Sequence, residues 1–371
     1  MKICLVEPFH GGSHATWAEE YANYSRHDVS LLTLSGRHWK WRMHGGAVSL
    51  AKRFIAGDFQ PELLLVSDML DLTTFLALTR EKTANLPVAL YYHENQLTYP
   101  WSPDDMDPQH KRDAHYAFIN YTSALAADAI LFNSRYHLES LTGQLPGFLK
   151  GFPDHNELEN VALIKAKSQV LPLGLDLQAL DRYRPEQPKQ ASEPPLILWN
   201  HRWEYDKNPA EFFRALCQLH DEGLSFQVAI LGEAYRKSPE IFDKARQQLG
   251  EKVIQFGYVK SFSDYARWLW RADILPVTSQ HDFFGASVVQ AIYCNCIPLL
   301  PNRLAYPEHL PADRPARFLY DSDDALVKRL RAMLEGPLPR NEALRTHVTR
   351  YDWREQIKNY DDLFERMKKP T

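Results

Sequence analysis

The sequence lacks any apolar run long enough to cross a membrane. Of its 371 residues, 44% are hydrophobic and 24% are charged, which is the balance of a globular protein. No run approaches the roughly 18–20 apolar residues that span a bilayer. Residues 1–7 predict a first strand and lack the apolar core and cleavage site of a signal peptide. We therefore expect no membrane partner and a cytoplasmic location.

Cysteine and excess positive charge are also scarce. The four cysteines are Cys4, Cys217, Cys294 and Cys296. Only the last two are close in sequence, and no second pair could complete a zinc site. We expect buried free thiols and no zinc site built on them. The net charge of −4 indicates no general affinity for nucleic acid, although a local basic patch can suffice.

Short apolar runs alternate with helical patterns through both halves of the chain, without repeats or low-complexity tracts. This alternation predicts an α/β protein with two mostly parallel sheets, each covered by helices on both faces. In the first half we expect strands at residues 2–7, 29–33, 63–67, 89–92, 129–133 and 168–173, and a helix at 113–127. In the second half we expect strands at residues 196–200, 227–231, 253–256, 274–277 and 297–299.

Residues 183–195 separate the two halves. They are rich in proline and charge and have no apolar period, which predicts a linker. We expect an N-terminal Rossmann-like domain at residues 1–180, a second one at 195–345 and a C-terminal helix at 350–371. Two such domains leave a cleft between them, and parallel sheets bind ligands at the carboxyl ends of their strands.

Paired glycines follow the first predicted strand. Gly11, Gly12 and Ser13 stand at a strand-to-helix turn, and we expect a helix from about residue 15. There the backbone can approach a ligand closely, and a helix N-terminus favours a phosphate. A tight turn that needs glycine for its own sake is an equal alternative.

The second domain offers cations and a second helix start. Arg202 and Lys207 follow its first strand, where a guanidinium fork and an ammonium suit a diphosphate leaving group. Two solvated surface cations are the alternative. After residue 277, a loop with Gly285 leads into a helix that begins at Ala286, and its first amide groups form an anion site.

Two polar side chains flank that helix start. Asp282 can accept hydrogen bonds from sugar hydroxyls, and Gln290 lies about two helical turns further on. An acidic residue, Phe-Gly and a polar residue eight positions after the first resemble the E-x7-E signature of the retaining GT-B glycosyltransferases of family 4. Both positions depart from glutamate, and Gln290 carries no charge. A protein that only binds tRNA or a nucleotide is therefore an alternative.

Seven segments resemble one family of this class, the tRNA-queuosine α-mannosyltransferases. The H-E-N-Q-x-x-Y-P run at residues 93–100 is the most specific of them. The segments are residues 7–14, 38–42, 92–100, 132–134, 152–155, 281–285 and 306–308.

The resemblance implies a GT-B fold with an N-terminal acceptor domain, a C-terminal donor domain and a C-terminal helix that crosses back to the first. It implies transfer of mannose from GDP-mannose to the cyclopentene-diol of queuosine in a tRNA anticodon, with the anomeric configuration retained. It implies no cofactor, no metal and no protein nucleophile, since the donor's own phosphate takes the acceptor proton. A transferase with a lipid or glycan acceptor stays an alternative, and protein partners are not predicted.

The histidine at the end of the predicted strand 89–92 has a candidate role in the chemistry. His93 could contact the sugar or polarise the acceptor hydroxyl, and Glu94 could orient either. A structural histidine is the alternative. The expected catalytic residues are His93, Glu94, Arg202, Lys207 and Asp282. The expected donor-binding residues are Gly11, Gly12, Ser13, Arg202, Lys207, Gly232, Tyr258, His281, Phe284, Gly285, Ala286, Ser287 and Gln290.

Residues 37–44 mix cations with tryptophans, which suits stacking on bases and contact with phosphates. A loop with inward-packed tryptophans is the alternative. Asp154 and His155 form either a ligand pair or a surface turn. The expected acceptor-binding residues are His14, Trp39, Trp41, Arg42, Asn95, Gln96, Asn133, Asp154 and His155.

Overall fold

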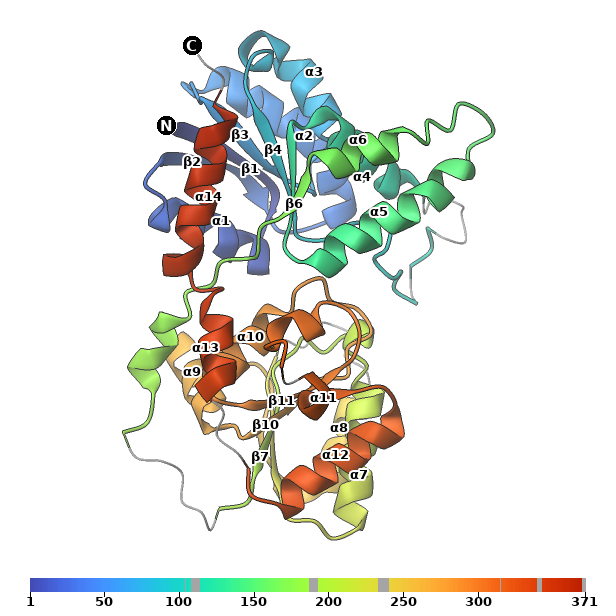
Figure 1. Ribbon diagram of the computed structural model, residues 1–371, viewed down its shortest axis with the longest axis vertical. Helices are drawn as coiled ribbons and strands as arrows, with labels where there is room; N and C mark the ends of the chain where they lie inside the picture. Colours follow the sequence, from blue (N-terminus) through green and yellow to red (C-terminus); the bar gives the residue numbers. More distant parts are fainter. Residues whose placement is uncertain are drawn as a thin grey trace. The chain divides into compact units, whose positions relative to one another are not determined.

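The computed structural model describes residues 1–103, 105–107, 114–186, 193–232, 240–313, 315–338 and 342–368. They form two compact units (Figure 1), one of Met1–Leu175 with Trp353–Thr371 and one of Asp176–Asp352. Part of the expected linker, residues 187–192, lies outside the described residues. Each unit holds one six-stranded sheet, and all strand pairs in the two sheets are parallel. The predicted α/β class with two parallel sheets is confirmed.

The sheet of the first unit has the strand order β2-β1-β3-β4-β5-β6. Its strands are β1 (Lys2–His10), β2 (Asp28–Ser35), β3 (Leu63–Ser67), β4 (Val88–Tyr92), β5 (Ala129–Phe132) and β6 (Ser168–Val170). Its helices are α1 (Gly12–Tyr24), α2 (Trp39–Ala56), α3 (Leu72–Thr83), α4 (Ala114–Ala126), α5 (Arg135–Lys150), α6 (Asn160–Ala166) and α14 (Trp353–Met367). Because β2 and β3 lie on opposite sides of β1, the switch point of this sheet is between β1 and β3.

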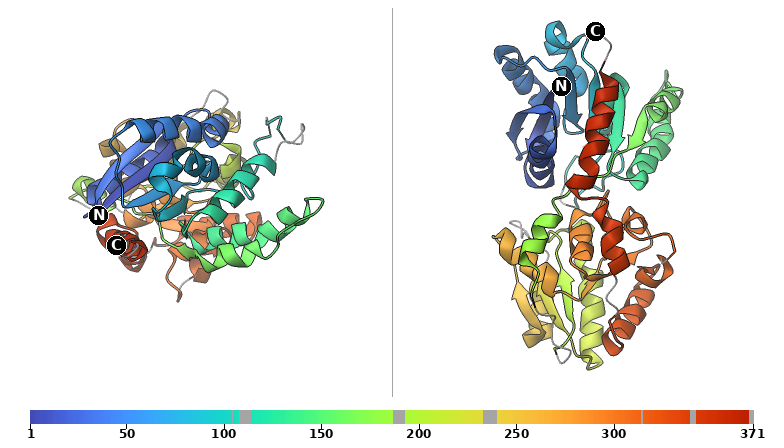
Figure 2. Two further views of the ribbon diagram at one scale, coloured as in Figure 1. Left: turned by 90° about the horizontal axis from the view of Figure 1, so that it is seen from above. Right: turned by 60° about the vertical axis from the view of Figure 1, so that its left-hand side comes forward.

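The inner strands of this unit are apolar on both faces, as parallel strands covered by helices on each side must be. All five residues of β3 and of β4 are buried. Figures 1 and 2 show α14, drawn in red, alongside α1 on one side of the sheet. The Tyr21 ring of α1 lies 5.6 Å from that of Tyr360 and 5.9 Å from that of Phe364, centroid to centroid. The C-terminal helix therefore returns to the N-terminal unit, as expected.

The sheet of the second unit has the strand order β12-β11-β10-β7-β8-β9, so its switch point lies between β7 and β10. Its strands are β7 (Leu196–Trp199), β8 (Gln227–Ile230), β9 (Val253–Phe256), β10 (Ile274–Pro276), β11 (Ile297–Pro301) and β12 (Leu319–Tyr320). Its α-helices are α7 (Pro209–Asp221), α8 (Ile241–Leu249), α9 (Phe262–Arg271), α10 (Ala286–Tyr293), α11 (Pro315–Phe318), α12 (Asp323–Glu335) and α13 (Glu342–Thr349). Four short 3₁₀ turns are η1 (Gln178–Tyr183), η2 (Tyr205–Lys207), η3 (Gly250–Lys252) and η4 (Tyr306–His309).

One helix starts earlier than the sequence predicts, and another was not predicted. α1 begins at Gly12 rather than near residue 15, so Ser13 and His14 belong to its first turn. α2 begins at Trp39, so the predicted contact segment 37–44 is mostly helical and not a loop. None of the helices in the described ranges combines the length and the apolar character needed to cross a bilayer.

Candidate active site

Polar residues of the first unit collect where its strands end. Gly11 separates β1 from α1, Asp68 follows β3, His93 follows β4 and Asn133 follows β5. These four strands are parallel neighbours, so their carboxyl ends share one edge of the sheet. The structure thus brings the predicted glycine turn and the predicted His93 to the same switch point.

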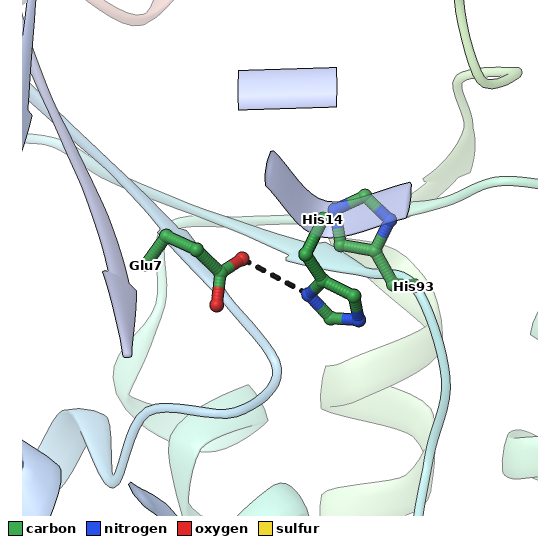
Figure 3. A group of neighbouring side chains, drawn as sticks. All are labelled: Glu7, His14 and His93. Carbon is green, nitrogen blue, oxygen red and sulfur yellow. Dashed lines mark hydrogen bonds and ion pairs between the residues drawn. The ribbon is translucent and has the colours of Figure 1, made fainter. Parts of the chain in front are cut away.

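His14 extends from the first turn of α1 toward Glu7 of β1 (Figure 3). Its Nδ1 lies 3.0 Å from Oε2 of Glu7, and the Glu7 side chain is fully buried. Burial lowers the pKa of His14, but the Glu7 carboxylate outweighs burial and raises the pKa to about 9. His14 is therefore an imidazolium at neutral pH.

His93 begins the loop after β4 and packs on His14. The two ring centroids are 4.2 Å apart, and the backbone N–H of His93 donates to Oδ1 of Asp68 at 2.8 Å. Burial, together with the neighbouring His14 charge, lowers the pKa of His93 well below its ordinary value. The ring of His93 is therefore a neutral imidazole beside a charged one.

The rest of the H-E-N-Q loop is braced by its own hydrogen bonds. Oδ1 of the fully buried Asn95 accepts from the backbone N–H of Thr98 at 2.9 Å. Nε2 of Gln96 donates to Oε1 of Glu94 at 2.7 Å. Asn133 donates from Nδ2 to the carbonyl of His93 at 2.9 Å. Asn95 and Asn133 thus shape the loop, and acceptor binding by Asn95, Gln96 and Asn133 stays a prediction.

The segment at the start of α2 presents one aromatic ring to solvent. Trp41 is 63% exposed, whereas the ring of Trp39 lies 5.0 Å from that of Tyr116, centroid to centroid. The guanidinium of Arg42 donates to the carbonyl and the hydroxyl of Ser35 at 3.0 and 3.1 Å. Of these three predicted acceptor contacts, Trp41 is the best placed to stack on a base.

Asp154 and His155 lie away from the strand edge. They are exposed residues of the turn after α5. α5 starts directly after Ser134 and has 16 residues, which carry the chain about 24 Å from that edge. The structure therefore does not bring this pair together with His93, and its role as an acceptor contact stays a prediction.

The second unit has its own collection at the switch point between β7 and β10. Arg202 follows β7, and His281 and Asp282 follow β10. Gly285 precedes α10 with a φ of +87°, and a Cβ there would lie 3.1 Å from the ring of Tyr306. Glycine thus sets up the predicted helix start, whose first amide groups lack acceptors within the helix and can bind an anion.

Lys207 is 8% exposed and holds this loop together. Its Nζ lies 2.9 Å from the carbonyl oxygen of His281, 3.1 Å from Oδ2 of Asp206 and 3.3 Å from Oδ2 of Asp282. Burial raises the pKa of Asp282, but the Lys207 ammonium outweighs it and lowers the pKa to about 2. Burial lowers the pKa of Lys207, but the carboxylates of Asp282 and Asp206 raise it above its ordinary value. Lys207 and Asp282 form a fixed ion pair.

Arg202 differs from Lys207 in its accessibility. Its side chain is 47% exposed and lies 3.2 Å from Glu204. Of the two predicted diphosphate-binding cations, Arg202 is thus the one that a ligand can reach without rearrangement.

The remaining predicted donor contacts are polar side chains with partners of their own, a glycine with a positive φ and two aromatic residues. Gln290 accepts from the hydroxyl of Tyr265 through Oε1 at 2.9 Å, and the Ser287 hydroxyl lies 3.1 Å from Nδ1 of His201. Gly232 has a φ of +107°, and a Cβ there would lie 1.9 Å from the carbonyl oxygen of His201. Phe284 is 4% exposed, whereas Tyr258 is 61% exposed. The close approach of His201 explains the glycine at residue 232, and burial explains the aromatic ring at residue 284. Donor binding by these residues stays a prediction.

Four residues of the two collections were missed by sequence reasoning: Glu7, Asp68, Asp206 and Tyr306. Glu7 is a charged residue within an otherwise apolar strand, and Asp68 follows its strand just as His93 does. Both signals were available. Nothing local marks Asp206 or Tyr306 as neighbours of Asp282.

Glu7, His14 and His93 are also metal-capable side chains whose ligand atoms lie within 4.8 Å of one another. Both oxygens of Glu7 already accept hydrogen bonds, Oε1 from the backbone N–H of Phe9 at 2.7 Å and Oε2 from His14. We therefore assign no metal to the group, and the expectation that no metal is bound stays a prediction.

Two family models match the chain. The model for the N-terminal part of tRNA-queuosine alpha-mannosyltransferase matches residues 2–175, and the model for glycosyl transferases group 1 matches residues 182–351. A curated relative, the tRNA-queuosine alpha-mannosyltransferase of Drosophila melanogaster, is 33% identical over 334 residues, which cover 88% of this chain and 85% of that protein. This chain belongs to the tRNA-queuosine α-mannosyltransferase family. The family predicted from the sequence is confirmed, and with it the class of glycosyltransferases.

Solved structures outside the tRNA-queuosine α-mannosyltransferase family share the fold. Sucrose-phosphate synthase from Thermosynechococcus elongatus has a TM-score of 0.71 at 16% identity and covers 99% of both chains. An alpha,alpha-trehalose-phosphate synthase from Burkholderia xenovorans has a TM-score of 0.65 at 13% identity, over 99% of both chains. A lipopolysaccharide outer core galactosyltransferase has a TM-score of 0.63 at 12% identity, over 99% of this chain and 100% of that one. At such identities the likeness shows the fold alone, and the GT-B class is confirmed.

Proposed function

We propose that this chain transfers mannose from GDP-mannose to the cyclopentene-diol of queuosine in a tRNA anticodon, with retention of the anomeric configuration. The observation that carries the proposal is the 33% identity with the Drosophila tRNA-queuosine alpha-mannosyltransferase over most of both chains. GDP as the nucleotide, and retention, come from the resemblance to the family.

Groups of the second unit support the proposed donor chemistry. The start of α10 offers amide groups for a diphosphate, and Arg202 adds an accessible guanidinium that can bind phosphate in a bidentate manner. Lys207 holds Asp282 and the carbonyl of His281 in place. These groups stabilise the negative charge that develops on the departing GDP, and Asp282 accepts from sugar hydroxyls.

The first unit supplies the acceptor side. His93 and Glu94 follow β4, the strand next to the switch point, where they contact the sugar or orient the acceptor hydroxyl. No protein nucleophile, metal or further cofactor takes part in the proposed reaction, because the donor phosphate accepts the proton. Trp41 offers a stacking surface for an unpaired base of the tRNA. A tRNA acceptor supports the proposed cytoplasmic location.

The test is transfer by the purified protein. Queuosine-containing tRNA is incubated with GDP-mannose or with UDP-glucose, and the digested nucleosides are analysed by mass spectrometry. We expect a hexose on queuosine with GDP-mannose alone, released by an α-specific but not a β-specific mannosidase. A product with UDP-glucose alone, or release by the β-specific enzyme, contradicts the proposed donor or stereochemistry.

A further inference from the structure

Glu7 is a buried carboxylate at the switch point of the first unit, where the reaction proposed above needs no buried anion of its own. Its side chain is fully buried. Oε1 accepts from the backbone N–H of Phe9 at 2.7 Å, and Oε2 lies 3.0 Å from Nδ1 of His14. An ionised carboxylate only accepts hydrogen bonds. Nδ1 of His14 must therefore carry its proton toward Glu7, which fixes the orientation of the His14 ring.

The His14 ring in turn packs on His93, whose position is fixed from several sides. The centroid of the His93 ring lies 4.2 Å from that of His14, 4.6 Å from that of Trp17 and 4.9 Å from that of Tyr91. The backbone of His93 is bonded to the side chains of Asp68 and Asn133. Figure 3 shows the two imidazoles one above the other, with Glu7 beside the ring of His14.

Nε2 of His93 is buried and has no hydrogen-bond partner among the described residues. A buried ring nitrogen left unpaired costs free energy, and buried polar groups without a partner call for an explanation. A hydroxyl group of a bound substrate would satisfy it. This nitrogen is thus the atom of the cluster that points to a ligand.

The two rings hold one proton more than two neutral imidazoles would, and the charges around them decide which ring carries this shared proton. Glu7 from β1 and Glu94 after β4 favour a proton on His14, and Asp68 after β3 does so to the extent that it is ionised, because burial raises the pKa of Asp68 well above its ordinary value. His14 and His137 of α5 both disfavour a proton on His93. Two imidazolium rings at this separation would repel each other. The pair therefore holds one positive charge, and the hydrogen bond to Glu7 assigns it to His14.

We propose that Glu7 is a positioning residue that keeps the shared proton on His14, so that His93 meets a substrate hydroxyl as a neutral imidazole through Nε2. The hydroxyl belongs to the transferred sugar or to the acceptor diol, and the proposal rests on the proposed function. Glu7 touches neither substrate and acts through His14 and His93.

The test uses Glu7→Gln, which keeps the size and an accepting oxygen but removes the charge. The matched control is Glu19→Gln, since Glu19 forms a comparable contact of 3.2 Å with His10 but is 57% exposed. kcat/KM for mannosyl transfer to queuosine tRNA is measured from pH 6 to 10. In the wild type and the control we expect kcat/KM to stay level as the pH falls from 9 to 6, because the proton that the pair takes up is held on His14. In Glu7→Gln that proton can move to His93, so kcat/KM should match the control near pH 10 and fall further below it as the pH is lowered.

A merely structural role of Glu7 would lower the rate by the same factor at every pH, and that result would overturn the proposal. Glu7→Asp, which keeps the charge, should restore the wild-type pH dependence at a lower rate. If Glu7→Gln does not fold, His14→Gln serves instead and should show the same loss of rate at low pH. Stoichiometric zinc in the purified protein, with transfer lost on chelation, would also contradict the proposal.

A second readout needs no transfer. In protein labelled with ¹⁵N-histidine, the His14 resonance, assigned with His14→Gln, should titrate near pH 9, and that of His93 should stay neutral down to pH 6. A His14 that titrates below pH 7 in the wild type would refute the proton assignment. An inactive wild type with the expected titration would refute the proposed function alone.

Discussion

At the scale of single residues, the two cations predicted for the donor site differ. Lys207 belongs to a buried ion pair, whereas Arg202 faces solvent. Lys207 is enclosed by Asp206, Asp282 and the carbonyl of His281, whereas Arg202 is about half exposed. The two cations therefore do different work. Removing one partner of a buried pair leaves an uncompensated charge, which costs more than the pair itself contributes.

We predict that Lys207→Ala and Arg202→Ala fail in different ways. Lys207→Ala leaves Asp206 and Asp282 buried without their cation and should lower the free energy of unfolding by about 3–5 kcal/mol. Arg202→Ala should leave it within about 0.5 kcal/mol while reducing transfer about 100-fold. Urea unfolding and initial rates measure the two effects. Undiminished transfer by Arg202→Ala would show that the donor site is wrongly placed.

Three buried histidines of the second unit give it an acid-sensitive stability. Burial lowers the pKa of His201, His281 and His309 to about 4. The charge of Lys207 adds to this lowering at His201 and His281. In the unfolded chain a histidine titrates near 6.5. As the pH falls from about 6.5 to 4, the unfolded chain binds protons that the folded unit does not, so stability is lost over that window.

His201→Gln should remove one of the three groups that bind a proton in the unfolded chain but not in the folded unit. The free energy of unfolding, measured in urea at pH 7, 6 and 5, should then fall less steeply, by up to about 1.4 kcal/mol per pH unit. The exposed His155→Gln is the matched control and should follow the wild type. Equal slopes in all three proteins would mean that His201 is protonated in the folded unit.

At the scale of elements, α14 completes the first unit and constrains a glycine. Trp353 is fully buried at the start of α14 and donates from Nε1 to Glu20 of α1 at 2.6 Å. A Cβ at Gly174 would lie 2.4 Å from the Trp353 ring. Neither the ring nor the backbone can move away easily in a packed interior.

Gly174→Ala should therefore destabilise the protein by about 1–3 kcal/mol, as overpacking does. The control is Gly143→Ala within α5, where a Cβ would meet nothing within 4 Å. There alanine should stabilise by about 0.5–1 kcal/mol. Thermal unfolding of both variants measures the contrast, and similar melting temperatures would mean that α14 does not pack on residue 174.

The sequence was most informative about elements with strong patterns. The inner strands of both sheets were predictable because their runs of apolar residues are buried on both faces, as in β3 and β11. The two-residue strand β12 was not predicted because it is too short to show a pattern. Helix α2 was not predicted, and at its start Trp39 packs against Tyr116 of α4, a contact between distant segments.

The candidate site was predictable where one strand end sufficed and not where distant segments meet. His93, Arg202 and Asp282 follow strands that the sequence reveals, so their edge could be inferred. The bond between Glu7 and His14 and the enclosure of Lys207 depend on which side chains converge in space. No spacing within the sequence encodes that convergence.

At the scale of the whole molecule, one chain holds two parallel sheets, and each sheet gathers polar groups at its own switch point. The first unit holds the imidazole pair, and the second holds the start of α10 and the ion pair of Lys207 and Asp282. Membership of the tRNA-queuosine α-mannosyltransferase family rests on similarity along most of the chain. The central claim is therefore about one acceptor nucleoside.

The most direct measurement compares two tRNAs that differ only at the wobble position, one with queuosine and one with guanosine. Each is incubated with the purified protein and radiolabelled GDP-mannose, and label in the tRNA is counted over time. We predict near-stoichiometric labelling of the queuosine tRNA and background labelling of the guanosine tRNA. Equal labelling of the two, or label in neither, would contradict the proposed function.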